Sequence, residues 1–376
     1  MGWDCGAHMK ILQVIFNDPK YGGGIEHMAV ELSKRLSADG NVVDIVCASV
    51  SESSVQTNFG NLITLKIADF TFAGPLRTAL KKILFNKKVK LFIQKNGKNY
   101  DILHIHGDVC GFKELENYNS IATFHGFTSD AAKKRNLFTK LILYIFSGRY
   151  EIKNAIHAKT LIAVSKSVAN SINKISHKKV EVIYNGVDSS LYKPINQKHK
   201  YEMRRKLGMK KNEFYVLFSG VDKYIKGFDI LLKSSKLLND GVQINVLGIS
   251  GKNKPKIKFL GYLSDNTKME YIKCSDIFVA PSRYDAFPLA TLEAMSCGLP
   301  TIISDTVGTK EILKNKYDGI IIKGLNASKY TQTINKLAKN RKLLKRLSLN
   351  GRKLALKYDW ENVYIKYKQI YDRVVV

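Results

Sequence analysis

Short apolar runs alternate with helical patterns along most of the chain. The first run, Ile11–Phe16, is of the buried-strand type and leads into three consecutive glycines. Apolar residues then repeat at helical spacing over 25–36, Gly40 ends that pattern, and a second strand-like run follows at Val42–Ser49. A strand–helix–strand unit of this length predicts a parallel sheet.

Two series of similar runs follow, with helical patterns between most of them. The first series comprises Ile102–Ile105, Ser120–Phe124, Thr160–Val164 and Val180–Tyr184. The second comprises Tyr215–Ser219, Gln243–Leu247, Lys256–Leu260, Ile277–Ala280, Thr301–Ile303 and Gly319–Ile322. The 376 residues are too many for one ordinary core and fit two domains. We therefore predict an α/β protein with two doubly wound halves.

A linker is expected over Asn185–Lys198, where a strand-like run ends in Asn-Gly and Pro194 and charged residues follow. The expected domains are residues 9–188 and 189–357. The last segment, 358–376, carries an apolar stripe at helical spacing that must pack on another element. Its members are Trp360, Val363, Tyr364, Tyr367, Ile370, Tyr371 and Val374.

The composition is that of a folded soluble protein, with 45% hydrophobic and 25% charged residues. The apolar stretch Leu141–Phe146 is far shorter than the roughly 20 residues that a membrane span needs, and the N-terminus shows no signal-peptide pattern. The five cysteines are scattered, which favours a reducing cytoplasm over a disulfide framework or a zinc site. Met1–His8 match no element, and we expect a native start at Met9.

The formal net charge of +29 is unusual for a protein of this length. Residues 77–98 hold eight basic and no acidic side chains, and residues 133–159 hold seven basic side chains against one acid, Glu151. Such a field favours a polyanionic partner, either anionic lipid or nucleic acid. The alternative is a surface that is merely solvated by lysine.

Several motifs occur in order along the chain. They are YGGGIEHMAVELSKRL (21–36), DILHIHGD (101–108), TFHGF (123–127), LIAVSKSV (161–168), VIYNGVD (182–188), FSGVDKYIKGFDILL (218–232), APSRYDAFPLATLEAMSCGLP (280–300) and YDWENV (358–363). With them the chain resembles the family 4 retaining glycosyltransferases over nearly everything from Met9 to Val376. The resemblance implies the GT-B fold, in which two Rossmann-like domains face each other across a cleft and the C-terminal helix returns to the N-terminal domain. The N-terminal domain is then expected to bind the acceptor and the C-terminal domain the nucleotide sugar.

The segment 280–300 is the most diagnostic of these motifs. Asp285 and Glu293 have the spacing of the two acidic positions of the family, which implies contacts with the transferred sugar and with the ribose hydroxyls, respectively. Pro288 suits the first turn of a helix and Gly298 its end. The family normally has Glu where Asp285 stands, and the shorter side chain draws the carboxylate back by roughly 1.5 Å. The helix N-terminus is expected to bind a donor phosphate through the backbone of Phe287, Pro288, Leu289 and Ala290.

The segment 218–232 resembles the phosphate-binding loop of the family. Lys226 occupies the position of the lysine that pairs with the donor diphosphate, and Gly220 precedes it in the same loop. Val221 stands where the family usually has Arg, so that a bidentate phosphate clamp is missing. Lys223 is a candidate for compensating charge, and an ordinary surface lysine is the alternative.

Four further candidates lie in the first half of the chain. His125 follows a strand end, the usual place for ligand contacts in doubly wound sheets, and the resemblance places it beside the transferred sugar. His106 also ends a strand and is expected to line or shape the acceptor site. Gly23 and Gly24 lie before a helix, where exposed amides attract phosphate, and the resemblance places them near the donor.

We therefore predict a glycosyltransferase with His125, Lys226 and Asp285 as its catalytic residues. It would move a hexose or N-acetylhexosamine from a UDP- or GDP-linked sugar to a glycan or lipid-linked acceptor, in glycoconjugate or polysaccharide synthesis. Cationic side chains and amide dipoles would stabilise the leaving diphosphate, so that neither a metal nor a further cofactor is expected. The basic clusters would hold the enzyme on the inner face of the membrane, with no nucleic-acid partner.

Three alternatives remain open. Another enzyme with the GT-B architecture, such as an epimerase or a phosphorylase, shares the fold. A non-catalytic nucleotide-sugar-binding protein would account for Val221 and Asp285. A nucleic-acid-binding protein would account for the charge, although the sequence shows no recognised reading motif and no aromatic stacking platform. The residues leave the donor base, the sugar and the acceptor open.

Overall fold

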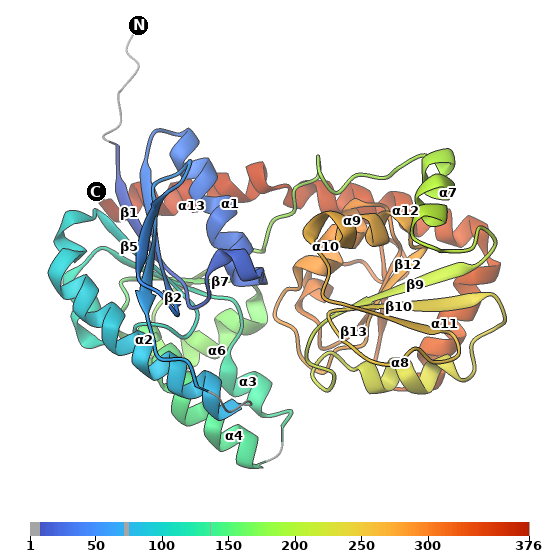
Figure 1. Ribbon diagram of the computed structural model, residues 1–376, viewed down its shortest axis with the longest axis horizontal. Helices are drawn as coiled ribbons and strands as arrows, with labels where there is room; N and C mark the ends of the chain where they lie inside the picture. Colours follow the sequence, from blue (N-terminus) through green and yellow to red (C-terminus); the bar gives the residue numbers. More distant parts are fainter. Residues whose placement is uncertain (1–7, 71–74, 136, 376) are drawn as a thin grey trace, which may run out of the picture. The chain divides into compact units, whose positions relative to one another are not determined.

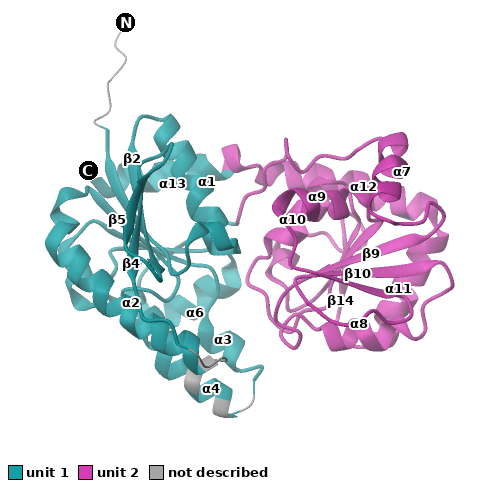
Figure 2. Cartoon of the chain, in the orientation of Figure 1, with its two compact units in different colours: residues 1–184, 363–376 teal, residues 185–362 magenta. Residues whose placement is uncertain are grey.

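The chain folds into two compact units (Figure 2). The structure, a computed structural model, describes residues 8–70, 75–135 and 137–375. One unit runs to Tyr184 and takes up the chain again at Val363, and the other is Asn185–Asn362. The junction thus lies a few residues before Asp188, the end that the sequence predicted for the first domain. Residues 1–7 of the expected non-native start lie outside the described residues.

The first unit is built on an eight-stranded sheet with the order β3-β4-β2-β1-β5-β6-β7-β8 (Figure 1). Neighbouring strands are parallel except β3 and β4, which are antiparallel. The strands are β1 (Lys10–Val14), β2 (Val42–Ser49), β3 (Ser53–Gln56), β4 (Asn61–Lys66), β5 (Ile102–His106), β6 (Ser120–Phe124), β7 (Thr160–Ala163) and β8 (Val180–Val182). The order of strands reverses between β1 and β5, and in open α/β sheets ligands bind at the carboxyl ends of the strands at such a point.

Helices cover both faces of this sheet. They are α1 (Gly24–Ala38), α2 (Pro75–Asn96), α3 (Thr128–Ala132), α4 (Leu137–Leu143), α5 (Arg149–His157) and α6 (Lys166–Ser176). Alternate residues of a strand point to opposite faces. Val14 accordingly packs in one cluster with Phe85 and Val89 of α2, and Ile15 packs in another with Ala29 of α1. Short 3₁₀ segments lie at Pro19–Tyr21, Gly97–Asn99 and Lys113–Asn117, and a π-helical turn lies at Tyr144–Gly148.

Two strands of the first unit were not predicted from the sequence. β3 is exposed along its whole length and has the mostly polar sequence SSVQ, so it lacks the apolar run by which the other strands were recognised. It pairs only with β4, at the edge of the sheet, where one partner suffices. β4 in turn joins β2 through Leu65, which lies opposite Ala48.

The second unit has a six-stranded, all-parallel sheet with the order β11-β10-β9-β12-β13-β14. The strands are β9 (Phe214–Ser219), β10 (Val242–Leu247), β11 (Ile257–Gly261), β12 (Ile277–Ala280), β13 (Thr301–Ser304) and β14 (Ile320–Ile322). Numbered along the chain, this is the 3-2-1-4-5-6 order of a Rossmann fold. Its reversal point lies between β9 and β12. Both predicted strand series are therefore confirmed, with ends that agree or differ by one or two residues.

The core of the second unit joins its sheet to helices on either face. The helices are α7 (Gln197–Lys206), α8 (Phe228–Ser235), α9 (Asp265–Cys274), α10 (Leu289–Ser296), α11 (Ala327–Lys339) and α12 (Arg341–Ala355), with 3₁₀ segments at Gly308–Glu311 and Leu356–Tyr358. Val216 and Val246 of the sheet pack in one cluster with Leu231 of α8 and Ile334 of α11. Among the described cysteines, Cys47, Cys110, Cys274 and Cys297 are buried free thiols.

The last helix, α13 (Trp360–Val375), returns to the first unit, as the predicted fold class requires. The Tyr371 hydroxyl and His104 Nδ1 of β5 are 2.6 Å apart, and the Tyr364 hydroxyl donates to Asp39 at 2.8 Å. Tyr367 and Tyr371 are almost fully buried. From Val363 on, the apolar stripe that the sequence placed on this helix therefore packs in the first unit, whereas Trp360 is buried against Gly186 of the second unit. No helix of the described residues is both long and apolar enough to cross a membrane.

Candidate active site

The reversal point of the second sheet brings Lys226 and Asp285 into contact. Lys226 lies in the loop after β9 and Asp285 in the loop after β12, and their side chains form an ion pair. The Lys226 side chain is 27% exposed and that of Asp285 14%, so both groups remain accessible from solvent. Two candidates that are 59 positions apart in the sequence are thus one charged pair at the carboxyl ends of adjacent strands.

Two glycines make room for this pair. A Cβ added to Gly220 would lie 2.6 Å from Cγ of Lys226, so the lysine side chain passes directly over the glycine. Gly227 has a left-handed φ of +70°, and a Cβ there would lie 1.9 Å from the carbonyl oxygen of Pro281. Since glycine alone lets backbones approach this closely, Gly227 holds the loop after β9 against the loop after β12.

Arg283 locks the same two loops together. Its guanidinium makes a bidentate ion pair with Asp229 of α8, at 2.6 and 2.8 Å, and donates to the carbonyl of Tyr224 at 2.7 Å. Its backbone N–H donates to the carbonyl of Ile225, again at 2.7 Å. The sequence motif contained Arg283, but sequence reasoning assigned it no role because its partners lie in a different motif.

The backbone around Asp285 is also fixed from outside its own loop. The Gly308 N–H donates to the Asp285 carbonyl at 2.7 Å, and a Cβ on Gly308 would lie 1.6 Å from the carbonyl oxygen of Ala286. Asn185 donates through Nδ2 to the carbonyl of Phe287 at 2.8 Å. The sequence suggested that Asn185 only formed a corner between domains, whereas the structure shows that it also positions the segment before α10.

The helix that follows Asp285 begins one residue later than the position of Pro288 suggested. Pro288 is the N-cap residue of α10, and the helical residues start at Leu289. The amides of Leu289 and Ala290 are in the first turn, where backbone N–H groups have no partner within the helix. Gly298 has a φ of +78° and follows the C-cap residue, so the predicted helix end is confirmed.

Glu293 has a cationic partner that sequence reasoning missed. Its side chain is 6% exposed, and both carboxylate oxygens lie 2.8 Å from Nζ of Lys268 on α9. Burial and then the charge and hydrogen bond of Glu293 raise the pKa of Tyr192, which places this hydroxyl beside the carboxylate as well. A ligand hydroxyl that reaches Glu293 therefore meets a carboxylate that is already neutralised and held in place.

The remaining candidates of the β9 loop are less closely grouped. Val221 is 54% exposed. Lys223 is exposed and lines a cavity of about 510 Å³ together with Ser250, Lys252 and Lys254. Neither Lys226 nor Asp285 is among the residues that line this cavity. Lys223 thus lines a neighbouring cavity, and its contribution to donor binding stays a prediction.

The reversal point of the first sheet carries a chain of hydrogen bonds that ends at His125. Gln13 Nε2 donates to the carbonyl of Ala29 at 3.2 Å and to Ser33 Oγ at 2.7 Å. A carbonyl only accepts, so Gln13 presents its own oxygen to His106, whose Nε2 lies 2.7 Å away and must carry a proton. His106 Nδ1, 3.1 Å from His125 Nε2, is then the acceptor of that bond.

This chain selects one tautomer of His125, with the proton on Nε2 and a free lone pair on Nδ1. Burial lowers the pKa of His106 well below its usual value and that of His125 to about 4. Both rings are therefore neutral near pH 7. His125 can accept a hydrogen bond from a ligand hydroxyl through Nδ1, and it is too weak a base to carry a positive charge there.

We expect Gln13→Leu to lower activity about tenfold with little change in fold, because His106 then loses the acceptor that fixes its tautomer. The ¹⁵N shifts of His125 report the tautomer directly and should change towards a mixture. Ser33→Ala is the matched control, since it removes another hydrogen bond of Gln13 and leaves His106 untouched. Unchanged imidazole shifts in Gln13→Leu would show that the chain does not set the tautomer.

Gly23 and Gly24 lie at the start of α1, Gly23 as the N-cap residue. The Glu26 carboxylate folds back over this turn and comes so close to Gly23 that a Cβ added there would lie 2.1 Å from Glu26 Oε2. Glu26 Oε1 accepts a hydrogen bond from Asn17 at 2.8 Å. The helix N-terminus thus already has a negative partner, which the sequence did not indicate, and the donor contact of both glycines stays a prediction.

A buried carboxyl group holds the loop that follows His125. Glu151 of α5 accepts a hydrogen bond from the backbone N–H of Thr128, at 2.8 Å, where α3 begins. Burial and the nearby charge of Asp108 raise the pKa of Glu151 to about 8, so the group is largely protonated at neutral pH. Sequence reasoning had counted Glu151 only as one acid among lysines.

This raised pKa gives a prediction for stability against pH. The native protein holds the Glu151 proton more tightly than the unfolded chain, whose carboxyl has a pKa of 4.5. Stability is therefore lost as the pH rises from there through about 8. Glu151→Gln keeps an oxygen for Thr128 and has no charge, so its gain in urea midpoint over wild type should be larger at about pH 9 than at about pH 5. An equal gain at both values would contradict the assignment.

Among the residues that the structure describes, no group of three or more His, Cys, Asp or Glu side chains is arranged to hold a metal ion.

Comparison with known proteins matches both halves of the chain. Residues 22–191 match the family described as Glycosyltransferase Family 4, and residues 199–354 match Glycosyl transferases group 1.

Relatives and solved structures agree with these matches. An uncharacterized glycosyltransferase of Methanocaldococcus jannaschii is 27% identical over 376 residues, which cover 97% of this chain and 99% of the relative. The UDP-Gal:alpha-D-GlcNAc-diphosphoundecaprenol alpha-1,3-galactosyltransferase of Escherichia coli is 25% identical over 345 residues, covering 84% and 83% of the two chains. Sucrose-phosphate synthase of Thermosynechococcus elongatus has the same fold, with a TM-score of 0.82 at 18% identity over 98% of this chain and 99% of its own.

The two family matches follow each other along the chain, in the places of the two Rossmann-like units. Since together they leave only the linker and the two ends unmatched, the chain belongs to the family 4 glycosyltransferases and has their GT-B fold.

Proposed function

We propose that this glycosyltransferase moves a hexose or N-acetylhexosamine from a nucleoside diphosphate sugar, with UDP or GDP as the carrier, to a lipid-linked or glycan acceptor. The observation that carries the proposal is the Lys226–Asp285 pair at the reversal point of the second sheet, directly before the N-terminus of α10. A cation and a carboxylate meet there, and the amides of the first turn of α10, which have no partner within the helix, follow a few residues later in the chain. Diphosphate requires cationic and amide donors, and sugar hydroxyls require a carboxylate acceptor.

In the proposed reaction the bond between the anomeric carbon and the diphosphate oxygen breaks, and the diphosphate leaves with the electron pair. Lys226 and the α10 amides stabilise the growing negative charge, which takes the place of a metal ion in this mechanism. The acceptor oxygen bonds to the anomeric carbon from the same face, so that the configuration is retained, and its proton passes to the departing diphosphate. Asp285 and neutral His125 orient the hydroxyls of the transferred sugar.

The proposed class of acceptor is based on the acceptor for which a relative is named. The Escherichia coli relative is named for a UDP-galactose donor and a diphosphoundecaprenol-linked acceptor. We propose the same kind of acceptor for the first unit here, with His106 shaping its site, in the synthesis of a polysaccharide or another glycoconjugate.

A membrane-surface location is part of the proposal. The α4 region carries apolar side chains that face solvent, with Leu137 80% and Leu141 55% exposed. Tyr144 and Ile145 continue this exposed stripe. Exposed basic residues flank it, namely Lys133, Lys134, Lys140 and Arg149. Apolar anchors among cations are suited to an anionic lipid surface, and this supports the proposal that the enzyme works on the cytoplasmic face of the membrane.

The test of the reaction is a release assay with UDP- and GDP-sugars and a diphosphoundecaprenol-linked acceptor, in the presence and absence of EDTA. We expect transfer from one donor class, unaffected by EDTA, and an NMR spectrum of the product with the donor's anomeric configuration. Binding of a nucleoside diphosphate without turnover of any donor would favour a non-catalytic binding protein instead. An inverted product would overturn the proposed mechanism.

The test of the location is co-sedimentation with neutral and anionic vesicles at low and high salt. Wild type should bind anionic vesicles at low salt, and Leu137→Ser/Leu141→Ser should bind much less. Leu237→Ser is the control, because Leu237 is 68% exposed and lies in the second unit. Equal, negligible binding of wild type to both kinds of vesicle would remove the membrane from the proposal.

A further inference from the structure

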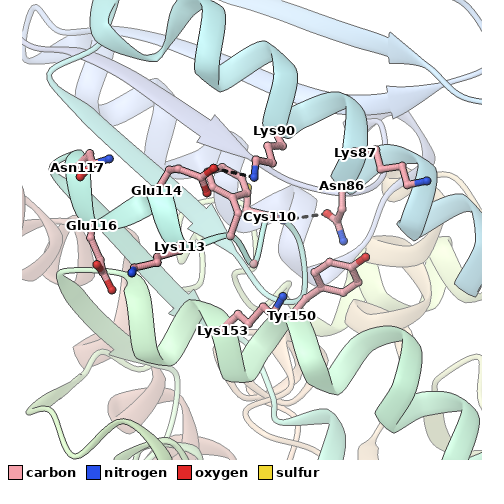
Figure 3. Close-up of a pocket in the computed structure, with 12 residues that line it drawn as sticks. Asn86, Lys87, Lys90, Cys110, Lys113, Glu114, Glu116, Asn117, Tyr150 and Lys153 are labelled. Carbon is pink, nitrogen blue, oxygen red and sulfur yellow. Dashed lines mark hydrogen bonds and ion pairs between the residues drawn. The ribbon is translucent and has the colours of Figure 1, made fainter.

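A cavity of about 630 Å³ opens in the first unit, away from the residues assigned above (Figure 3). Its walls are α2, the loop after β5, the 3₁₀ segment Lys113–Asn117 and α5. His106, His125 and Lys82 are not among the residues that line it. The cavity is therefore separate from the hydrogen-bond chain that ends at His125.

The base of the cavity is rigid. Cys110 and Gly111 both have left-handed backbones, with φ values of 68° and 67°. The Cys110 N–H donates to Asn86 Oδ1 of α2 at 2.8 Å, and the Gly111 N–H donates to Asn154 Oδ1 of α5 at 2.9 Å. A Cβ on Gly111 would lie 2.6 Å from the ring of Tyr150, so that ring closes one side. Two helices thus clamp a turn whose conformation a non-glycine residue adopts only at a cost.

One donor at this base is unused. Asn86 is 4% exposed and its Oδ1 is engaged by Cys110, whereas its Nδ2, which can donate two hydrogen bonds, has no partner among the described residues. Figure 3 shows this nitrogen turned towards Tyr150, another residue that lines the cavity. Buried amide donors are nearly always satisfied, so this nitrogen is available to an acceptor that reaches it from the cavity.

The rim carries more positive than negative charge, because four lysines and two glutamates line the cavity. Lys90 is paired with Glu114 at 2.7 Å, and Glu116 with His157 at 2.6 Å. Lys87, Lys113 and Lys153 also line the cavity, are exposed, and make no ion pair with any described residue. The excess of ammonium groups around a buried amide donor favours an anion that accepts several hydrogen bonds.

We propose that this cavity binds a phosphate ester, carried either by a soluble metabolite or by a phospholipid headgroup. The phosphate oxygens accept from Asn86 Nδ2 at the base and from the lysines at the rim. This site lies outside the machinery proposed for sugar transfer, and its existence does not depend on the reaction that the protein catalyses.

The first arm of the test uses soluble probes, inorganic phosphate and glycerol 3-phosphate, titrated into the full chain. All proteins in this arm also carry Lys226→Ala, so that a probe bound at the Lys226–Asp285 pair does not contribute to the signal. We expect the probes to raise the melting temperature and to give a measurable Kd by calorimetry. Lys87→Ala/Lys153→Ala should weaken the binding tenfold or more. Lys88→Ala/Lys98→Ala removes the same charge from exposed positions on and after α2 that do not line the cavity, and should change it less than about twofold.

Asn86→Asp tests the buried donor itself. The aspartate keeps an oxygen for the Cys110 N–H, removes the Nδ2 donor and adds a negative charge, so binding should be lost. Circular dichroism shows whether this variant still folds, and the lysine pair gives an independent answer if it does not.

The second arm uses vesicles of phosphatidylcholine with and without phosphatidylglycerol, and the same variants, each also carrying Leu137→Ser/Leu141→Ser so that the exposed stripe of α4 does not contribute. Binding of the soluble probes assigns the site to a phosphate ester in general. Binding to the anionic vesicles alone, lost in both Asn86→Asp and the Lys87/Lys153 variant, assigns it to a headgroup. Absence of binding in both arms would overturn the proposal. An equal loss of binding in the Lys88/Lys98 control would also overturn it, since the general charge of the surface would then account for the binding.

Discussion

Lys226→Ala is expected to lower kcat/KM by roughly 100- to 1,000-fold, the loss typical for one group that stabilises transition-state charge. The substitution removes the cation from the leaving diphosphate and leaves the Asp285 carboxylate, 14% exposed, without its partner. The Asp285 carboxylate, no longer paired with a cation, then repels the negatively charged donor diphosphate. Steady-state kinetics with a saturating acceptor measure the effect.

Two comparisons make this result specific. If Lys226 acts on the departing diphosphate, most of the loss appears in kcat, whereas a lysine that only binds the donor raises KM with kcat unchanged. Lys233→Ala is the control, because this exposed lysine lies on α8, seven positions further along the chain, and should leave both constants within about twofold. A Lys226→Ala enzyme with normal kcat and KM would remove the Lys226–Asp285 pair from the mechanism.

Gly227→Ala is expected to destabilise the second unit strongly, by roughly 3 kcal/mol or more. A left-handed alanine alone costs about 1–2 kcal/mol. The added Cβ would also lie 1.9 Å from the Pro281 carbonyl, so the β9 and β12 loops must separate. Because Lys226 precedes this glycine directly, donor affinity should fall together with the urea midpoint.

Gly208→Ala separates the cost of a left-handed alanine backbone from the cost of the contact with Pro281. Gly208 has a φ of +65°, close to that of Gly227, and a Cβ there meets no atom within 4 Å. It should therefore lose only the backbone cost of about 1–2 kcal/mol and keep its affinity for nucleoside diphosphate. If both variants have the same urea midpoint, the contact between Gly227 and Pro281 does not hold the loops together.

Most of the fold was predictable because the pattern of apolar residues in a strand or helix indicates which of its residues are buried. Ile277–Ala280 is buried at all four positions and was predicted with its exact ends, and α13 was predicted from its apolar stripe alone. The strand β3 was missed for the same reason, since an exposed edge strand has no burial pattern to read. The motif order then identified the family, because family resemblance is itself a property of the sequence.

The site was predictable only in its principal residues. Lys226, Asp285 and Glu293 stand in recognisable motifs, and the structure places the first two in contact. The residues that hold them do not stand out in the sequence. Lys268 is one lysine among many until α9 is seen to bring it 2.8 Å from Glu293. Gln13 lies in an apolar run, and its role follows only from the alignment of β1 with β5.

The sequence by itself thus determined most of the strands and helices, how many domains they form and to which family the chain belongs, because burial periodicity and motif order are encoded locally. Only the tertiary structure decided the partners of each candidate: the tautomer of His125, the counter-ion of Glu293, the approach of Gly227 to Pro281 and the unused amide of Asn86. These depend on strand register and on the path of loops from distant parts of the chain. Contacts of that kind arise from packing in three dimensions, and no local pattern specifies them.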